Sequence, residues 1–330
     1  MPETRTGRPV LSIDLGGTKI IGALITPDYR VLAKERHPTL AGGGPDAVIG
    51  RVISLVDELL ERAGLVKSGV VGLSIAVAGA IEAARGVITV SPNLPGWCDI
   101  PLLDIVREKA GLRTWVLNDA KAAALGEYEL GAGKDTKHLV LLTIGTGIGG
   151  GLILNGELYT GTTGSAGELG HMTIDIHGPK CPCGNTGCLE VLASGTAIAR
   201  EARRRVLKEK SSLLDTVEGR VEEITAKKVG AAARDGDALS LDVVRHAGRY
   251  LGVGLVNLVN IFNPEVIIIG GGVSEMGEML LAPARELVDE RAIPISARTA
   301  RIITAELGND AGIFGAAAFA FKGRTAHESS

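Results

Sequence analysis

The sequence predicts an α/β protein made of two similar domains, and three observations support this prediction. Strand-length apolar runs alternate with helix-length segments along the 330 residues. A chain of this length folds more often as two domains than as one. The pattern of apolar strand, Gly/Thr turn and apolar strand at residues 14–25 returns at residues 139–154. This repeat indicates an internal duplication, with two similar sheets facing each other.

The N-terminal elements predict an antiparallel meander. A strand over Val10–Asp14 is followed by a second strand through Ile25 and a third over Val31–His37, and the connections are too short for a parallel crossover. A helix is expected over Asp46–Ala63. The remaining elements expected in this half are strands Val70–Ala76 and Trp115–Leu117 and an alanine-rich helix Asp119–Leu130.

The second half opens with a predicted hairpin, in which strands Leu139–Ile144 and Leu152–Leu154 flank a glycine-rich turn. Further elements are expected as helices Gly195–Lys208, Ala238–Ile261, Met276–Arg291 and Asp310–Phe321, and as strands Val266–Ile269 and Arg301–Ala305. The charged segment Lys208–Glu223 is expected to be a solvated surface segment, and the tail from Lys322 onward is expected to be frayed.

Composition excludes several classes of protein. The net charge of −3 gives no sign of the basic surface that binds nucleic acid, and 3% aromatic residues argue against a base-stacking surface. The longest apolar runs have the length of strands, so no membrane span is predicted. The N-terminal residues contain no export signal, and clustered thiols in such a chain are more often metal ligands than disulfides. We therefore expect a soluble, cytoplasmic protein.

Three of the four cysteines fall within eight residues, in a C-x-C-x4-C pattern with a histidine ten residues upstream. The predicted ligands of a closed tetrahedral zinc site are His171, Cys181, Cys183 and Cys188. The alternative interpretation is three reduced, buried cysteines that happen to cluster. Glu168 and Glu190 flank the cluster, so a metal there would shape a polar pocket. Cys98 is left over and is read as a partly buried thiol.

Glycine is the compositional outlier, with 46 residues where average usage would give about 23. Turns at Gly16–Lys19, Gly145–Gly151 and Gly270–Gly272 each follow an apolar strand and present backbone N–H groups that suit phosphate oxygens. Each turn alone is equally explained as a tight hairpin. Asp14 ends its strand where a carboxylate can hold Mg²⁺. The chain has neither a P-loop nor a Rossmann fingerprint after its first strand.

Asn118 and Asp119 stand where a short strand meets a helix. Asn118 is expected to be the N-cap of that helix. Asp119 either interacts with the helix dipole or acts as the general base on a substrate hydroxyl. The dipole is expected to keep Asp119 ionised at neutral pH, which suffices for phosphoryl transfer, where orientation matters more than basicity.

Seven motifs together resemble the ROK family (repressors, open reading frames, sugar kinases), and the resemblance spans residues 10 to 320. The motifs are Asp14–Lys19, Ser91–Trp97, Asn118–Ala120, Ile144–Gly151, Gly167–His171, Cys181–Glu190 and Ala193–Ala197. Within the family, the chain is most similar to glucokinases.

The resemblance implies a two-domain, actin-like ATPase (ribonuclease H-like) fold with the sugar in the cleft. It implies a small α/β domain of residues 1–118 plus about 310–330, and a large domain of 119–309 with a zinc-binding loop. It also implies ATP, Mg²⁺, structural Zn²⁺ and a homo-oligomer, a dimer or tetramer.

The family's catalytic base matches Asp119. Its sugar contacts match Asn93, Asn118, Asp119, Glu168, His171 and Glu190. Its nucleotide side, with Asp14, matches Gly16, Gly17, Thr18, Lys19, Gly145, Thr146, Gly147, Gly149, Gly270, Gly271 and Gly272.

The resemblance therefore implies ATP-dependent phosphorylation of the 6-hydroxyl of glucose. The alternatives are a kinase for N-acetylmannosamine, N-acetylglucosamine or fructose, a polyphosphate-dependent kinase, and a sugar-sensing regulator without catalysis. Few residues precede the first strand, so the helix-turn-helix of the family's repressors is not expected here. Lys121 stands where the family commonly has Asn or Asp. Its side chain is expected to reach solvent, or alternatively bound phosphate.

Overall fold

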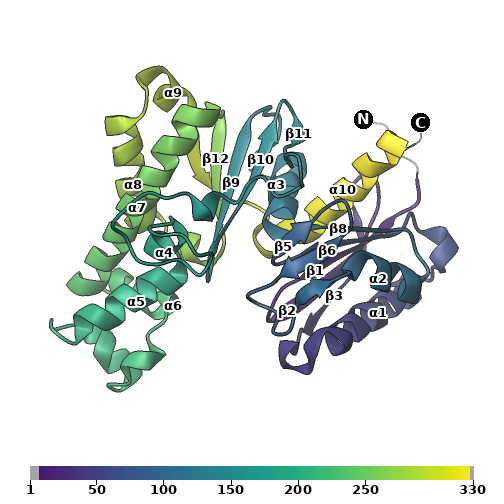
Figure 1. Ribbon diagram of the computed structural model, residues 1–330, viewed down its shortest axis with the longest axis horizontal. Helices are drawn as coiled ribbons and strands as arrows, with labels where there is room; N and C mark the ends of the chain where they lie inside the picture. The colour runs from purple at the N-terminus through teal and green to yellow at the C-terminus, as the bar shows by residue number, and fades with distance from the viewer. Residues whose placement is uncertain (1–6, 328–330) are drawn as a thin grey trace.

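A computed structural model describes residues 7–327, of which 324–327 are described by their backbone alone. Two five-stranded sheets lie in separate halves of the molecule, each with its own helices (Figure 1). The first sheet has the order β3-β2-β1-β4-β8. Its strands are β1 (Val10–Leu15), β2 (Lys19–Ile25), β3 (Val31–Pro38), β4 (Leu73–Val77) and β8 (Thr114–Asn118).

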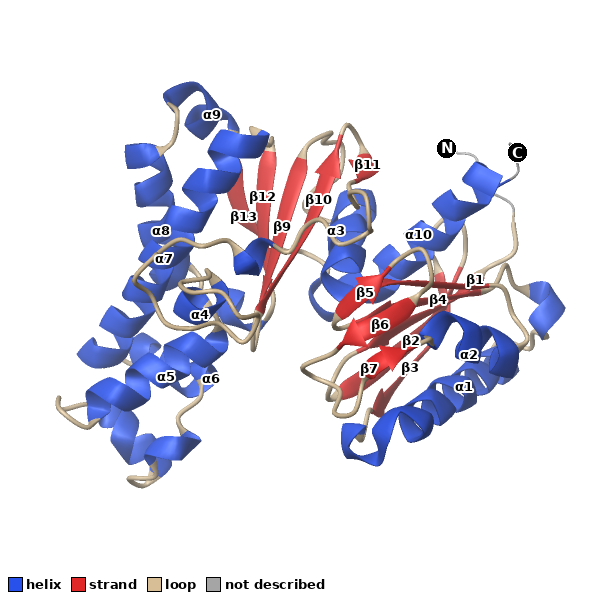
Figure 2. Ribbon diagram, viewed as in Figure 1, coloured by secondary structure: helices blue, strands red, loops and turns tan. Residues whose placement is uncertain are grey.

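The second sheet has the order β11-β10-β9-β12-β13 and repeats the plan of the first (Figure 2). Its strands are β9 (Leu139–Ile144), β10 (Ile148–Leu154), β11 (Glu157–Leu158), β12 (Val266–Gly270) and β13 (Arg301–Thr304). In each sheet an antiparallel meander comes first, and two parallel strands are then added beside its first strand. The expected meander and the expected pair of similar sheets are both confirmed.

Two long helices lie between the sheets and cross each other, α3 (Asp119–Leu130) and α10 (Ala311–His327) (Figure 1). Their backbones approach closely because glycines stand at the crossing. A Cβ at Gly126 would overlap the carbonyl oxygen of Ala311, and one at Gly315 would overlap that of Ala122. Both helices begin near the middle of the molecule, so the residues at their N-termini come together.

The remaining helices cover the outer faces. The first half carries α1 (Gly44–Arg62) and α2 (Leu102–Ala110), and the second carries α4 (Glu190–Ala193), α5 (Gly195–Val206), α6 (Ala226–Arg234), α7 (Ala238–Phe262), α8 (Glu278–Arg291) and α9 (Pro294–Thr299). Separate apolar cores form under the two sheets, with Leu11, Ile13 and Leu59 in one and Leu142, Leu255 and Ile269 in the other. Among the described residues, no helix is long and apolar enough to cross a membrane.

Some predicted boundaries differ from the structure. The strand expected over Val70–Ala76 begins at Leu73, and the one expected from Leu152 begins four residues earlier. A third, smaller sheet was not predicted, and it is made of β5 (Ala80–Glu82), β6 (Val87–Val90) and β7 (Cys98–Ile100). These strands are only three or four residues long, which gives a weak periodic signal.

Three surface predictions differ from the structure. Cys98, read as a partly buried thiol, is exposed. Most of the segment Lys208–Glu223 is exposed, as predicted, but Leu213 and Val217 are buried in the core of the second half, because a 3₁₀ turn over Ser212–Val217 folds them inward. The chain from Lys322 is still helical as far as His327. Lys322 pairs with Glu129 at 2.9 Å, which ties the end of α10 to α3. Residues 328–330 lie outside the described part of the chain.

Candidate active site

The N-terminus of α3 presents two polar side chains in a fixed geometry. The Asn118 side chain accepts hydrogen bonds from the N–H groups of Ala120 and Lys121 at 3.0 and 3.1 Å, so its predicted N-cap role is confirmed. Its amide group donates to the carbonyl of Gly79 and to Asp119 Oδ1 at 3.1 and 3.0 Å. The cap thereby joins α3 to the first sheet and fixes the Asp119 carboxyl.

Asp14, near the end of β1, interacts electrostatically with Asp119. Burial raises the pKa of Asp14 to about 7, and the negative charge of Asp119 adds to this shift against the attraction of Lys19. Burial likewise raises the pKa of Asp119, and the charge of Glu168 contributes, although the Ala120 N–H donates to the Asp119 carboxylate at 2.9 Å. The pKa of Asp119 is therefore raised at this helix N-terminus, because desolvation outweighs the hydrogen bonds that lower it.

The first glycine turn is held by protein contacts. A Cβ at Gly17 would overlap the carbonyl of Asn93, so packing against the 91–97 segment requires glycine there. The Gly16 N–H donates to the Lys19 carbonyl at 3.0 Å. Lys19 donates from Nζ to Asn309 Oδ1, just before α10, and Thr18 is exposed beside it.

Gly312, in the first turn of α10, packs against Asp14, since a Cβ there would lie 2.8 Å from Asp14 Cγ. Sequence reasoning did not assign residues 308–312 to the site. Their run Gly-Asn-Asp-Ala-Gly at a predicted helix start was the available signal.

The glycines of the β9–β10 turn have different neighbours. A Cβ at Gly145 would meet nothing within 4 Å, whereas one at Gly147 would overlap the carboxylate of Glu190. A Cβ at Gly149 would lie 2.8 Å from that of Ala120, in α3. Of these three glycines, only Gly145 leaves open space that a ligand can approach.

Gly145 lines a cavity of about 520 Å³ in the second half of the molecule. Gly272 also borders it and faces open space, while Gly271 adopts φ +82° and packs on Ile144. The cavity walls include residues that sequence reasoning did not assign, among them Thr196, Arg203, Thr225, Lys227 and Met276. They lie on helices and a loop distant in sequence, and only Thr196 falls within one of the seven motifs, Ala193–Ala197.

Glu190 links the glycine turn to the cysteine loop. Its carboxylate accepts a hydrogen bond from the Ile148 N–H at 2.8 Å, and its backbone begins α4 directly after the loop. Glu168 precedes a single 3₁₀ turn that ends at His171, whose N–H donates to the Glu168 carbonyl at 3.1 Å. The two predicted sugar-binding carboxylates are thus attached to either end of the predicted zinc site.

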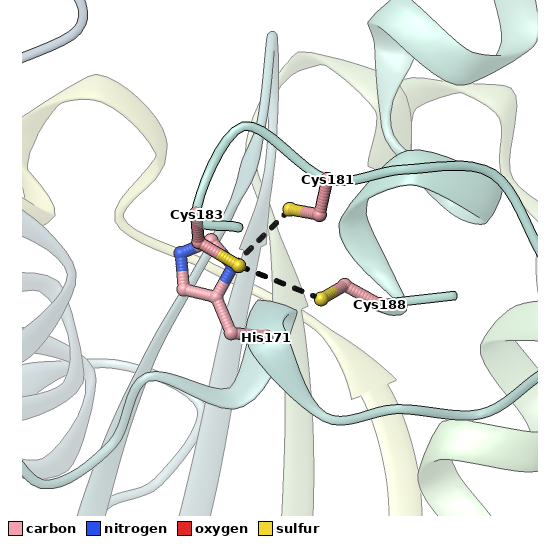
Figure 3. Close-up of side chains that lie close together, drawn as sticks. All are labelled: His171, Cys181, Cys183 and Cys188. Atoms are coloured by element: carbon pink, nitrogen blue, oxygen red, sulfur yellow. Dashed lines mark hydrogen bonds between the residues drawn. The ribbon is translucent and has the colours of Figure 1, made fainter. Parts of the chain in front are cut away.

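The four predicted metal ligands converge, with one ligand atom from each lying within 4.8 Å of all the others (Figure 3). Cys183 Sγ and Cys188 Sγ are 3.8 Å apart, and Cys181 Sγ is 3.7 Å from His171 Nδ1. Tetrahedral zinc with Zn–S bonds of ~2.3 Å separates two sulfurs by ~3.8 Å. The geometry therefore fits zinc.

The chemistry of the donor set agrees with the geometry. Burial and the neighbouring thiols raise the pKa of Cys188 to about 12, and burial raises that of Cys181. Thiolates this close together need a cation to balance their charge. Because His171 turns Nδ1 towards the thiols, its Nε2 remains available for another partner.

Comparison with known proteins identifies the family. The model of the ROK family matches residues 10–322. The chain belongs to the ROK family. A glucokinase of Thermotoga maritima is 39% identical over 308 residues, which cover 93% of this ROK protein and 96% of the relative.

A solved ROK glucokinase of Streptomyces griseus, in complex with glucose and AMPPNP, has a TM-score of 0.82 and 34% identity over 95% of this chain and 99% of that one. This likeness confirms the predicted two-domain, actin-like fold. A putative xylose repressor of Caldicellulosiruptor is 33% identical over 94% of this ROK protein but 77% of its own length. Proteins named as glucokinases and as a putative repressor are thus both similar to nearly the whole of this chain.

The side chain of Lys121 does not lie where the sequence analysis expects it. The lysine is buried, with 6% of its surface exposed, and donates from Nζ to the carbonyl of Gly164. It is neither directed to solvent, as expected, nor left free in the structure to reach phosphate. Its first-turn position brings it beside Glu168, whose charge opposes the lowering of the lysine pKa by burial.

Proposed function

We propose that this ROK protein transfers the γ-phosphoryl group of ATP to the 6-hydroxyl of glucose. The observation that carries the proposal is the Asp119 carboxyl, fixed at the N-terminus of α3 between the charges of Asp14 and Glu168. The names of relatives at 39–41% identity, all glucokinases, support the same reaction.

Asp119 is the proposed general base. Burial raises its pKa, which makes the carboxylate a stronger base than an exposed aspartate. The Asn118 amide and the Ala120 N–H hold Oδ1, so Oδ2 is left to accept the proton of the sugar hydroxyl. Orientation of that hydroxyl is the larger contribution in phosphoryl transfer.

The nucleotide is proposed to occupy the cavity beside Gly145 and Gly272, where backbone is exposed without side chains. The remaining residues proposed on the nucleotide side are Gly16, Gly17, Thr18, Lys19, Thr146, Gly147, Gly149, Gly270 and Gly271. Asp14 is the proposed carboxylate for Mg²⁺, which neutralises phosphate charge when it is bound. Gly147 and Gly149 support the turn through packing rather than by direct approach to phosphate.

The sugar is proposed to bind to Asn93, Asn118, Glu168, His171 and Glu190. Zinc held by His171 Nδ1 and the three cysteines would be structural, since four protein ligands leave no position for water. Its effect would be to fix both carboxylates and to leave His171 Nε2 as a donor to a hydroxyl.

The proposed domain division places residues 1–118 with 310–330, and 119–309 together. The packing of α10 on β1 and β4, and of α3 on β9 and β10, supports a boundary at these helices. Closure of the domains about the α3–α10 crossing would exclude water, which otherwise competes as acceptor. A cytoplasmic location and a dimer or tetramer remain predictions.

The test is a coupled assay of ADP release over a panel of hexoses and N-acetylhexosamines, with ATP or polyphosphate as donor. We expect glucose to give the highest kcat/KM with ATP. Turnover of another sugar in preference would reassign the substrate. Sugar binding without turnover of any panel member would instead favour a regulator of the kind seen in the family's repressors.

A further inference from the structure

Residues 160–168 form a loop of the second half of the molecule that packs against the first half. The loop follows β11 of the second sheet, and its Gly164 packs against Ala83 in the turn between β5 and β6 of the first half. A Cβ at Gly164 would overlap that of Ala83, and the residue adopts φ +86°. The contact therefore requires glycine both for space and for backbone conformation.

Lys121 holds this loop from the first turn of α3. Its Nζ donates to the Gly164 carbonyl, and among residues 7–327 no other side chain outside the loop forms a hydrogen bond with residues 160–168. Lysine is rarely buried without a partner, because removing its charge from water is costly. Here the carbonyl of Gly164 supplies that partner.

The loop ends at Glu168, which is exposed, and its side-chain carboxylate accepts no hydrogen bond from any residue in the described part of the chain. Glu168 acts electrostatically on both Lys121 and Asp119. The ammonium group therefore interacts with the loop at two points, the carbonyl of Gly164 and the carboxylate at the loop's end.

We propose that Lys121 is a positioning residue that docks loop 160–168 between the two halves and thereby sets Glu168 for the sugar. The proposal rests on the proposed function, in which Glu168 contacts the substrate. Asn or Asp, which the family resemblance implies at this position, has a side chain two atoms shorter and carries no ammonium group. Only a long cationic side chain at this position can therefore anchor loop 160–168 in this way.

The first experiment replaces Lys121 by methionine, which has similar length and no charge or donor. We expect the KM for glucose to rise about tenfold, while kcat and the KM for ATP change by less than about twofold. Thermal stability should stay equal or increase, because an apolar group replaces a buried charge. Lys109→Met, at an exposed site on α2, is the matched control and should leave all four quantities unchanged.

A double-mutant cycle separates positioning from a general structural role. If Lys121 acts through Glu168, then Lys121→Met should raise the glucose KM much less in a Glu168→Gln background than in the wild type. Gly164→Ala, which undocks the loop without touching Lys121, should reproduce the effect of Lys121→Met. Additive effects in the cycle, or equal rises in both KM values, would overturn the proposal.

Hydrogen–deuterium exchange of peptide 160–168, measured without substrates, tests the anchor independently of the reaction. Exchange should be faster in Lys121→Met than in the wild type or Lys109→Met. Unchanged exchange overturns the anchor even if the enzyme is active on glucose. If no sugar in the panel is phosphorylated by the wild type, the proposed function fails, and the exchange result still decides whether Lys121 holds the loop.

Discussion

Glu190 Oε2 accepts a hydrogen bond from the Ile148 N–H at 2.8 Å, so the cysteine loop and the glycine turn are joined through one carboxylate. A side chain at Gly147 would occupy the place of that carboxylate. The sequence alone suggests that Gly147 serves phosphate binding. The structure instead couples Gly147 to a proposed sugar contact, and the two interpretations predict different kinetic phenotypes.

Gly147→Ala should therefore affect the sugar more than the nucleotide. The added Cβ would displace the Glu190 carboxylate and break its bond to Ile148. We expect the KM for glucose to rise about tenfold, with a smaller change in the KM for ATP. Initial-rate kinetics with each substrate varied at saturating levels of the other measure both values. A rise confined to ATP would restore the interpretation from sequence.

Gly145→Ala should show the reciprocal pattern. Its Cβ meets no protein atom within 4 Å, so folding is preserved, but it projects into the nucleotide cavity. We expect the KM for ATP to rise about tenfold and the melting temperature and glucose KM to stay near wild type. A marked fall in melting temperature would show that Gly145 is constrained by packing and not by a ligand.

The sequence was most informative where local chemistry decides the structure. The helix over Asp119–Leu130 has the predicted bounds, because a capping asparagine begins it and alanines favour it. The cysteine cluster was likewise predictable, since its ligands are close in sequence and their spacing is restricted.

Long-range partners were not predictable. Lys121 is buried because a loop some forty residues later returns to its Nζ, and Gly147 lacks a side chain because Glu190 requires the space. The pKa of Asp119 is raised by burial that only the assembled fold creates. Single-sequence patterns carry no signal for such contacts, since neither residue type nor spacing identifies the partner.

Asp119→Asn should preserve the fold and glucose binding but abolish most of the turnover. The amide retains hydrogen bonding to neighbouring groups but cannot accept the proton of the sugar hydroxyl. We expect kcat to fall by about 10²–10⁴-fold, the contribution usual for a general base, with little change in glucose affinity by calorimetry. Retention of more than about a tenth of wild-type kcat would show that another group is the base.

Asp14 should make nucleotide binding and stability depend on pH. Its pKa of about 7 lies above the unfolded value of 3.8, so the native state holds a proton that the unfolded chain releases. The free protein should therefore lose stability between about pH 4 and pH 7, with no further loss from this group above that range. Mg²⁺ needs the ionised carboxylate, so the affinity for Mg²⁺–ATP should increase over the upper part of the same range.

Asp14→Asn tests both effects at once. The variant should unfold at a higher temperature than the wild type at pH 8 without ligands, because no buried charge forms, and its affinity for Mg²⁺–ATP should be weak and flat with pH. Calorimetric melting and nucleotide titrations at pH 5.5 and 8 provide the measurements. An unchanged pH dependence of nucleotide affinity in the variant would remove Asp14 as the relevant group.

The cysteine loop should contain about one zinc per chain and should control sugar affinity. The two carboxylates flank the four ligands in sequence, since Glu168 lies just before His171 and Glu190 just after Cys188. In Cys183→Ser the loop loses one ligand, so the zinc content should fall and the KM for glucose should rise more than that for ATP. Cys98→Ser, at the exposed cysteine outside the cluster, is the control and should retain zinc and both KM values. Elemental analysis alongside kinetics decides the matter, because a zinc-free preparation with a wild-type glucose KM would leave the three thiols as reduced cysteines packed by chance.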